Sequence, residues 1–247
     1  LEFSNDYGQT WQTLSDSVTG LKYYWENIPN IPSDECIIRI KQLRKHAFTF
    51  EPHGINWERN FGGSQYDEAT SIQQTNDGGY IVAGWTFSND DDISKNNGSS
   101  DYWIIKLKPD GTLDWEKIFG GTLHDEASSI QQTNDGGYIV AGFTVSSDKN
   151  ISENNGSSDY WIIKLNPDGT IDWEKSYGGG RGEYAYSIEQ TLDRGYIIAG
   201  LSYSNDGDIS ENKGESDYWI IKLNPDGTLD WEKSFGGSDR DEAYSIQ

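Results

Sequence analysis

A repeat of fixed length constrains this chain more than any other feature. Trp57, Trp115, Trp173 and Trp231 each open a Trp-Glu-(Arg/Lys) step that leads into Gly-Gly, and successive tryptophans lie 58 residues apart. No residue is gained or lost over three units. A strand-rich repeat of this length predicts a propeller or another repeat array, in which each unit buries its apolar surface against its neighbours.

Each unit is expected to hold four β-strands. In the first unit they span residues 67–75, 80–87, 101–108 and 113–119. The segments between them contain Asn-Asp-Gly-Gly and Pro-Asp-Gly, which supply the positive and preset φ angles of tight turns. The runs Tyr-Ile-Val-Ala-Gly and Tyr-Trp-Ile-Ile-Lys-Leu are rich in β-branched and aromatic residues, as strands are. No segment has the 3.6-residue apolar period of a long helix.

The second and third strands of a unit carry apolar residues on both faces, as Val82 alternates with Ile81 and Ala83. A sheet that is buried on both sides has this pattern, whereas a half-exposed sheet alternates apolar and polar residues. We therefore predict an all-β fold, a β-propeller of four-stranded antiparallel blades. A β-solenoid is the alternative. The full units are 62–119, 120–177 and 178–235, and partial blades are expected at 46–61 and 236–247.

The repeated motifs resemble a known bacterial family. The pattern Gly-Gly-x-x-x-Asp-Glu-Ala, then Asp-Gly-Gly-Tyr-Ile-Val-Ala-Gly, then Ser-Asp-Tyr-Trp-Ile-Ile-Lys-Leu-x-Pro-Asp-Gly-Thr is similar to the β-propeller repeats called SBBP-type. The likeness covers roughly residues 55–247. It implies a propeller in a large secreted or surface protein, notably of gliding, Bacteroidetes-like bacteria, and it implies no shared catalytic residue.

Residues 1–45 lack the motifs of the 58-residue repeat. Ser4-Asn5-Asp6-Tyr7-Gly8-Gln9-Thr10-Trp11 resembles the Asp-box, a hairpin element that lies away from the catalytic centre in sialidase-like propellers. The same string occurs in Ig-like or fibronectin-like modules of secreted bacterial proteins. Residues 24–40 resemble the closing strands of such a module. We expect residues 1–45 to form the C-terminal part of a β-sandwich and residues 46–247 to form the propeller.

Charge and composition reduce the number of function classes that fit this chain. The formal net charge is −22, from 41 acidic and 19 basic residues, so the chain is expected to bind neither nucleic acid nor anionic membrane surfaces. No run of 18 apolar residues is present, so membrane insertion is not expected. Cys36 is the one cysteine, which rules out an internal disulfide. Because the chain lacks methionine and stops within a repeat, we expect it to be a piece of a longer extracellular or cell-surface protein.

A long polar loop joins the second and third strands of each unit. In an up-and-down blade this loop shares one rim with the link to the next blade, whereas the short turns lie on the opposite rim. Side-chain oxygens recur in the loop at positions 1, 3, 5, 7 and 12, as in a site for a hard cation such as Ca²⁺. The candidate ligands are Asp90, Asp92, Ser94, Asn96 and Asp101, then Asp148, Asn150, Ser152, Asn154 and Asp159, and then Asp206, Asp208, Ser210, Asn212 and Asp217.

The same loop residues could instead have a purely structural role. Position 6 is Lys95, Glu153 or Glu211 where an EF-hand loop has glycine, and position 12 is aspartate where an EF-hand has glutamate. Asp, Asn and Ser also serve as turn and capping residues in solvated loops.

The sequence offers little evidence for a catalytic site. The three histidines, His46, His53 and His124, do not recur at matching positions of the repeat. Asp67-Glu68 and Asp125-Glu126 have the carboxylates that glycoside hydrolysis needs, but they recur in successive units, and this recurrence favours a structural role. The repeated tryptophans, and Trp85 with its counterparts Phe143 and Leu201, are expected in the core.

These features predict a non-catalytic secreted or cell-surface propeller for adhesion, ligand binding or display, stabilised by calcium if the loops bind it. The ligand would be an extracellular glycan or protein. The alternatives are a glycan-active enzyme or its accessory domain, and a structural spacer. A site unique to one unit would be expected near Leu123-His124 or Gly180–Glu183, where the units differ most. Uncovered blade faces would favour self-association.

Overall fold

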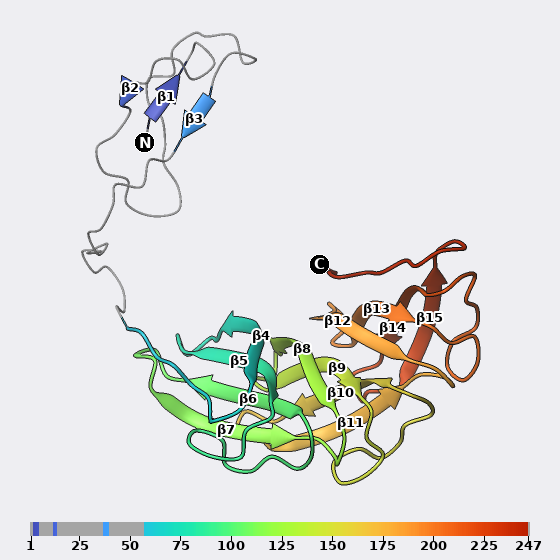
Figure 1. Ribbon diagram of the computed structural model, residues 1–247, viewed down its shortest axis with the longest axis horizontal. Coiled ribbons are helices and arrows are strands. Elements are labelled where there is room, and N and C mark those ends of the chain that lie inside the picture. Colours follow the sequence, from blue (N-terminus) through green and yellow to red (C-terminus); the bar gives the residue numbers. More distant parts are fainter. Residues whose placement is uncertain (1, 5–11, 14–36, 40–56, 247) are drawn as a thin grey trace. The chain divides into compact units, whose positions relative to one another are not determined.

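The computed structural model describes residues 2–4, 12–13, 37–39 and 57–246 (Figure 1). The chain divides into two units, Leu1–Asn56 and Trp57–Gln247. In the part of the chain so described, no helix has the length and apolar character needed to cross a membrane.

The first unit contains three short strands, β1 (Glu2–Ser4), β2 (Gln12–Thr13) and β3 (Ile37–Arg39). They form one antiparallel sheet in the order β2-β1-β3, with Phe3 opposite Gln12 and Ile38. The predicted β-sandwich stays a prediction, because most of residues 1–45 lie outside the described residues. The same is true of Asp-box residues 5–11, of Cys36, and of His46 and His53.

The second unit consists of three four-stranded antiparallel sheets, which we call blades 1, 2 and 3. Blade 1 holds β4 (Asp67–Gln74), β5 (Tyr80–Thr86), β6 (Asp101–Leu107) and β7 (Leu113–Phe119). Blade 2 holds β8 (Asp125–Gln132), β9 (Tyr138–Thr144), β10 (Asp159–Leu165) and β11 (Ile171–Tyr177). Blade 3 holds β12 (Glu183–Gln190), β13 (Tyr196–Ser202), β14 (Asp217–Leu223) and β15 (Leu229–Phe235). The prediction of an all-β propeller is confirmed, with strand bounds within one residue of those expected for blade 1.

A β-bulge in the first strand of each blade explains why apolar side chains three positions apart enter the same core, which the regular alternation of side chains along a strand does not allow. The register with the second strand shifts between Ala127 and Ser129 in blade 2, and at the equivalent place in blades 1 and 3. One extra residue there lets Ala127 and Ile130, three positions apart, enter the same core. The strand can therefore present both side chains to the preceding blade.

Each blade has two different apolar faces. The face that carries Tyr102, Tyr160 or Tyr218 is called the Tyr face, and the face that carries Trp103, Trp161 or Trp219 is called the Trp face. The Tyr face of blade 1 packs against the Trp face of blade 2, and blades 2 and 3 repeat the arrangement. All seven residues of β10 are buried between the two neighbouring blades, and those of β6 are buried between blade 2 and residues 57–61. This packing is why the sequence of these strands is apolar at both parities.

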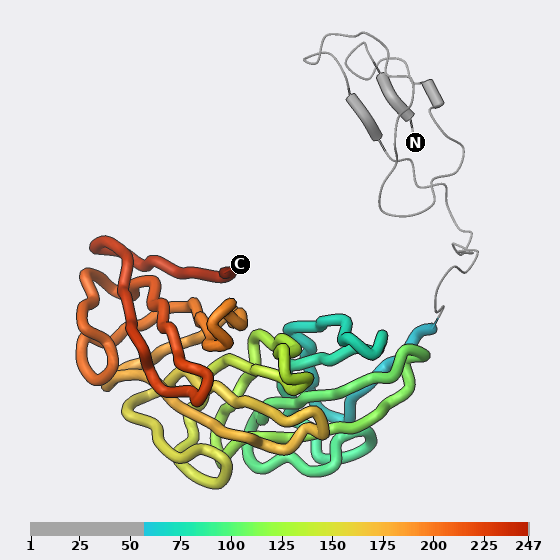
Figure 2. The backbone as a smooth tube through the Cα atoms, turned by 180° about the vertical axis from the view of Figure 1, so that it is seen from behind, coloured from blue at the N-terminus to red at the C-terminus, as the bar shows by residue number. Residues whose placement is uncertain are grey.

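The first strands of successive blades lie next to one another, as the tube view also shows (Figure 2). Polar side chains connect them. Ser71 Oγ accepts a hydrogen bond from the backbone N–H of Ile130 at 3.3 Å, and Ser129 Oγ accepts one from Ile188 at 3.3 Å. Gln131 Oε1 likewise accepts from the Gln190 N–H at 2.6 Å. This ladder satisfies backbone donors that the four-stranded sheets leave without partners.

Short segments flank the three blades. Residues 57–61 contain no strand, yet Trp57 packs edge-on against Tyr80 at 5.6 Å, as Trp115 does against Tyr138 at 5.8 Å. At the other end Ile246 N–H donates to Ser187 Oγ at 3.2 Å, in the manner of Ile130 and Ile188. The described parts of the two predicted partial blades thus contact blades 1 and 3 without forming strands, and the partial blades themselves stay a prediction.

Candidate functional site

The polar loops and the links between blades meet at one rim, as predicted. Asp90 Oδ1 accepts the Ser64 N–H at 2.8 Å, Asp148 Oδ1 accepts the Thr122 N–H at 2.9 Å, and Asp206 Oδ1 accepts the Gly180 N–H at 2.8 Å. We call this end of the unit the loop rim. The first position of the proposed calcium loop therefore fastens the loop to the link that precedes its blade.

The other candidate calcium ligands also hold backbone groups. At position 3, Asp92, Asn150 and Asp208 accept N–H groups of Gly62, Gly120 and Gly178. At position 7, Asn96, Asn154 and Asn212 donate to the carbonyls of Thr86, Thr144 and Ser202 and accept from Gly98, Gly156 and Gly214. At position 12, Asp101, Asp159 and Asp217 accept from Asn97, Asn155 and Lys213. Ser94, Ser152 and Ser210 at position 5 are exposed.

These contacts give the loop oxygens a role within the chain. Across the described residues, no three His, Cys, Asp or Glu side chains gather as a metal site. Calcium binding therefore stays a prediction, and calorimetry that detected no heat at millimolar Ca²⁺ would end it.

A buried pair of acidic side chains lies at the loop rim between successive blades. Asp101 faces Asp125 across Gly120, and Asp159 faces Glu183 across Gly178, where an added side chain would collide with both carboxylates. Asp125 accepts hydrogen bonds from Thr144, Ser146 and the Gly121 N–H. Within the described chain, Asp101 Oδ1 and Asp159 Oδ1 are buried and have no hydrogen-bond partner.

Burial therefore disfavours the charged form of one carboxyl in each pair. Desolvation raises the pKa of Asp101 to about 6 and that of Asp159 to about 7. The cation Lys149 opposes the shift at Asp101, whereas Asp159 is surrounded by Glu183, Asp208 and Glu153. The two junctions between blades thus differ in charge although their folds agree.

A second group of side chains at the loop rim breaks the repeat. The units differ there in residue type while the blade cores stay nearly identical. We call this group the rim patch, and it consists of Tyr66, Glu68, Trp85, Phe87, His124, Glu126, Phe143, Tyr184, Tyr186 and Tyr203. Because these positions vary while the blades pack alike, blade packing does not dictate them.

The rings of the rim patch form two series of contacts, one from blade 1 to the link before blade 2 and one from blade 2 to blade 3. Tyr66, which is 61% exposed, stacks on Trp85 with ring centroids 5.1 Å apart. Trp85 contacts Phe87 edge-on, and Phe87 contacts the His124 ring in the same way at 5.7 Å. Farther along, Tyr184 packs between Phe143 and Tyr203. Trp85 is therefore a half-buried rim residue, where the sequence had suggested a core position.

Carboxylates accompany these rings. Tyr66 donates its hydroxyl hydrogen bond to Glu68 at 2.9 Å, and this contact raises the pKa of the tyrosine. Ser100 Oγ lies 3.0 Å from His124 Nδ1 and 3.4 Å from Glu126 Oε1. Burial raises the pKa of Glu126, and the nearby His124 opposes that effect. Half-exposed rings beside hydroxyls and carboxylates can stack on an apolar ring face and exchange hydrogen bonds with a polar ligand.

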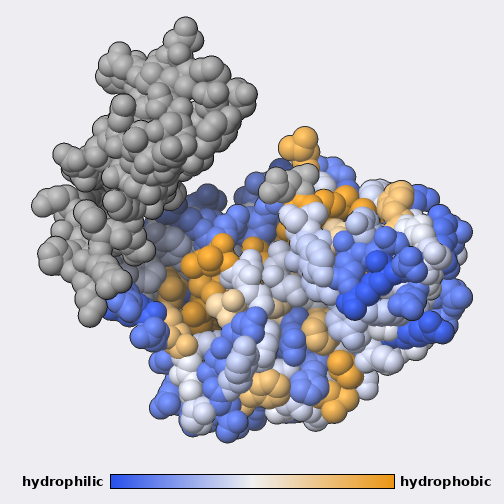
Figure 3. All heavy atoms as spheres, turned by 45° about the horizontal axis from the view of Figure 1, so that its top comes forward, coloured by the Kyte–Doolittle hydropathy of each residue, from blue (hydrophilic) through white to orange (hydrophobic). Residues whose placement is uncertain are grey.

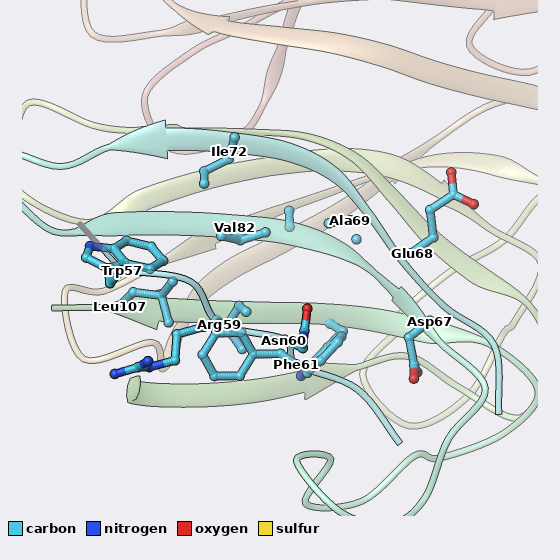
Figure 4. Close-up of a pocket in the computed structure, with 14 residues that line it drawn as sticks. Trp57, Arg59, Asn60, Phe61, Asp67, Glu68, Ala69, Ile72, Val82 and Leu107 are labelled. Atoms are coloured by element: carbon cyan, nitrogen blue, oxygen red, sulfur yellow. The ribbon is translucent and has the colours of Figure 1, made fainter. Parts of the chain in front are cut away.

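A cavity of about 350 Å³ lies on the Trp face of blade 1 (Figure 4). Trp57, Phe61 and Leu107 line one part of it, and Ile72 and Val82 line another. The buried indole N–H of Trp103 has no acceptor among the described residues, whereas the equivalent Trp161 donates to Glu174 at 2.9 Å. Glu68 of the rim patch also lines this cavity, which the sequence did not predict.

A comparison with protein families supports the fold. The model of a β-propeller family, a domain of unknown function (DUF5122), matches residues 75–114 and 133–172. A solved structure of a protein of unknown function from Bacteroides caccae is 13% identical, with 71% of this chain and 72% of that one covered and a TM-score of 0.25. No curated protein matches. The family match and the three antiparallel sheets together make this chain a β-propeller-repeat protein.

Proposed function

We propose that the chain is a non-catalytic binding propeller of an extracellular or cell-surface protein, and that its rim patch binds an uncharged glycan. The observation that carries the proposal is the gathering of repeat-breaking aromatic side chains at the loop rim, beside the carboxylates of Glu68 and Glu126. Residues that only hold blades together recur in all three units, as Tyr102, Tyr160 and Tyr218 do. The rim patch departs from this rule, and a ligand would account for the departure.

Its chemistry favours a glycan over other ligands. The apolar faces of Tyr66 and Trp85 suit the C–H surface of a sugar ring, while Glu68, Glu126 and His124 suit its hydroxyl groups. The net charge of −22 disfavours anionic polymers by repulsion. An uncharged polysaccharide or oligosaccharide is therefore the ligand class that fits best.

The alternative of a glycan-active enzyme finds less support in the geometry. Asp125, the candidate partner of Glu126 in an acid–base pair, is fully buried and accepts hydrogen bonds from three neighbours. A carboxylate held in this way has no exposed oxygen to present to a substrate. Release of reducing sugar from a polysaccharide panel would nevertheless overturn the non-catalytic assignment.

The test is a glycan array followed by calorimetry on the sugars retained. We expect Tyr66→Ala and Trp85→Ala to weaken binding by roughly tenfold or more, since stacking of a ligand ring on one aromatic side chain contributes on the order of 1–3 kcal/mol. Leu192→Ala is the matched control, because Leu192 is fully exposed on a turn of the opposite rim. Equal loss in the control, or no retained glycan, would contradict the proposal, and the latter would favour a spacer.

A further inference from the structure

Two of the three long loops on the loop rim contain an asparagine directly before a glycine. The pairs are Asn97-Gly98 and Asn155-Gly156, and Lys213-Gly214 is the equivalent pair in blade 3. A side chain on any of these glycines would collide with the backbone of the link that follows its blade. The position before the glycine lacks this constraint, because Lys213 and both asparagines donate their backbone N–H to an aspartate in the same way. Packing therefore requires the glycine and does not require the asparagine.

An asparagine before a glycine can lose its side-chain nitrogen without an enzyme. The backbone nitrogen of the glycine attacks the asparagine Cγ, its proton leaves with the side-chain nitrogen as ammonia, and a cyclic succinimide forms. Water then opens the succinimide and leaves either aspartate or isoaspartate, in which the chain continues through the side-chain carbon. Glycine favours the attack because it has no Cβ to obstruct it and its backbone adopts conformations that other residues avoid.

The side chains of Asn97 and Asn155 are available for this reaction. Neither makes a hydrogen bond within the part of the chain that the structure describes, whereas the preceding Asn96 and Asn154 donate and accept through their amide groups. Both pairs lie outside the strands, and Asn155 and Gly156 are exposed. The surface of the blades is largely hydrophilic, so water, the second reactant, reaches the loops (Figure 3).

Two contacts set the order in which the sites should react. The attacking nitrogen of Gly98 donates to Asn96 at 2.8 Å, and that of Gly156 donates to Asn154 at 3.0 Å, so each bond has to open first. In the first loop the Asn97 carbonyl also accepts a hydrogen bond from Lys149 Nζ. Gly207 takes the place of Lys149 one unit later and offers no ammonium group. Asn155 is therefore expected to react before Asn97.

We propose that Asn97 and Asn155 are sites of spontaneous deamidation, and that the product adds a carboxylate beside the buried acid pair of each covered junction. The backbone N–H of Asn155 donates to Asp159 Oδ2 at 2.8 Å, so a new charge on residue 155 lies close to Asp159. Glu183, Asp208 and Glu153 already surround that carboxyl, whereas the cation Lys149 lies near Asp101. Because like charges repel, deamidation at residue 155 should weaken its junction more than deamidation at residue 97.

Peptide mapping by mass spectrometry follows the reaction directly in the whole chain. During incubation at mildly alkaline pH, the peptides of Asn155 and then Asn97 should gain the mass difference between a hydroxyl and an amino group. Both should convert several-fold faster than three exposed asparagines that precede aspartate, Asn76, Asn134 and Asn205. Methylation by an isoaspartyl methyltransferase identifies the isoaspartate. No conversion at either site, or conversion no faster than at Asn76, would overturn the proposal.

A matched variant tests the effect on the junction. Asn155→Lys reproduces the residue of blade 3, where Lys213 makes the same backbone hydrogen bond, so the variant is expected to fold. The melting temperature of the wild-type chain should fall as residue 155 converts, and that of Asn155→Lys should fall less over the same incubation. Asn155→Asp should have a lower melting temperature from the start. Equal falls in the wild type and in Asn155→Lys would show that the new carboxylate does not weaken the junction, and would overturn that part of the proposal.

Discussion

The junction between blades 2 and 3 and the uncovered Tyr face of blade 3 contain equivalent positions of the repeat in different surroundings. Tyr160 is fully buried at the junction, whereas Tyr218, its counterpart, is 37% exposed. Tyr177 is buried and its counterpart Phe235 is exposed. The backbone register of the two blades is the same, so the difference arises from the neighbour alone.

This difference shows where the stability of the repeat originates. A single four-stranded sheet of this sequence leaves two apolar faces in water, and the next blade removes one of them. Burial contributes roughly 25 cal/mol per Å² of apolar surface, so most of the stabilising free energy belongs to junctions between blades. Substitutions of one residue type at covered and uncovered positions should therefore have unequal effects.

The largest effect is expected for tryptophan at a covered junction. Trp161→Ala should lower the free energy of unfolding by about 3–5 kcal/mol, the usual cost of emptying a large buried aromatic site. Trp231→Ala should cost less than about 1 kcal/mol, since Trp231 is 39% exposed on the outermost strand. Urea unfolding of both variants measures the two values. Equal losses would mean that coverage by a neighbouring blade does not set the cost.

The next effect concerns pH and separates the two covered junctions. Burial raises the pKa of Asp159 to about 7 in the folded chain, from an ordinary value of 3.8, so the folded state binds more protons than the unfolded state between these values. The free energy of unfolding should then fall as pH rises through roughly 4 to 8. Thermal melts at several pH values, with chelator present, measure this slope.

Asp159→Asn should remove the larger part of that slope, because it removes the titrating group and leaves its neighbours in place. Asp101→Asn should remove less, since the pKa of Asp101 rises only to about 6 beside Lys149. Asp193, whose pKa falls to about 2 through Thr191 and Lys222, acts in the opposite direction and only at acid pH. A wild-type melting temperature that rises from pH 5 to pH 8 would refute the assignment of buried acid pairs.

The smallest effect concerns one hydroxyl group. Tyr160→Phe removes the hydrogen bond to the Trp219 carbonyl and should cost about 0.5–1.5 kcal/mol. Tyr218→Phe should be neutral, because the Tyr218 hydroxyl makes no hydrogen bond to another of the described residues. Urea titration of this matched pair isolates the junction hydrogen bond. A cost for Tyr218→Phe as large as that for Tyr160→Phe would show that the bond contributes nothing specific to the junction.

Much of the fold was predictable because its signals are local and repeated. Strand content, turn residues and the double-sided apolar pattern of strands such as β10 follow from the residues themselves. The β-bulge beside Ala127 was not predictable, since its extra residue looks like ordinary strand sequence. Lys164 was also missed. Its ammonium group is buried and donates to Asp135 and to the Leu165 carbonyl, contacts that only the folded blade brings together.

The candidate site was predictable in place and less so in composition. The differences near His124 and Arg181 pointed to the loop rim, and the rim patch lies there. Tyr184 and Tyr203 were overlooked, although comparison of positions 58 residues apart would have revealed them as departures from Glu126 and Val145. The calcium prediction rests on the spacing of side-chain oxygens alone. A sequence does not show that Asp90 and Asp92 accept hydrogen bonds from two different backbone N–H groups, because those contacts form only in the folded loop.

Amide hydrogen exchange tests most directly whether contacts between neighbouring blades, rather than each sheet by itself, stabilise the repeat. The account predicts that amides of β10, which has a blade on each side, exchange more slowly than those of β14, although both strands read Asp-Tyr-Trp-Ile-Ile-Lys-Leu and have the same ladder partners. Equal protection of β10 and β14 would contradict it, because the sheet itself would then supply the stability that we assign to the junctions.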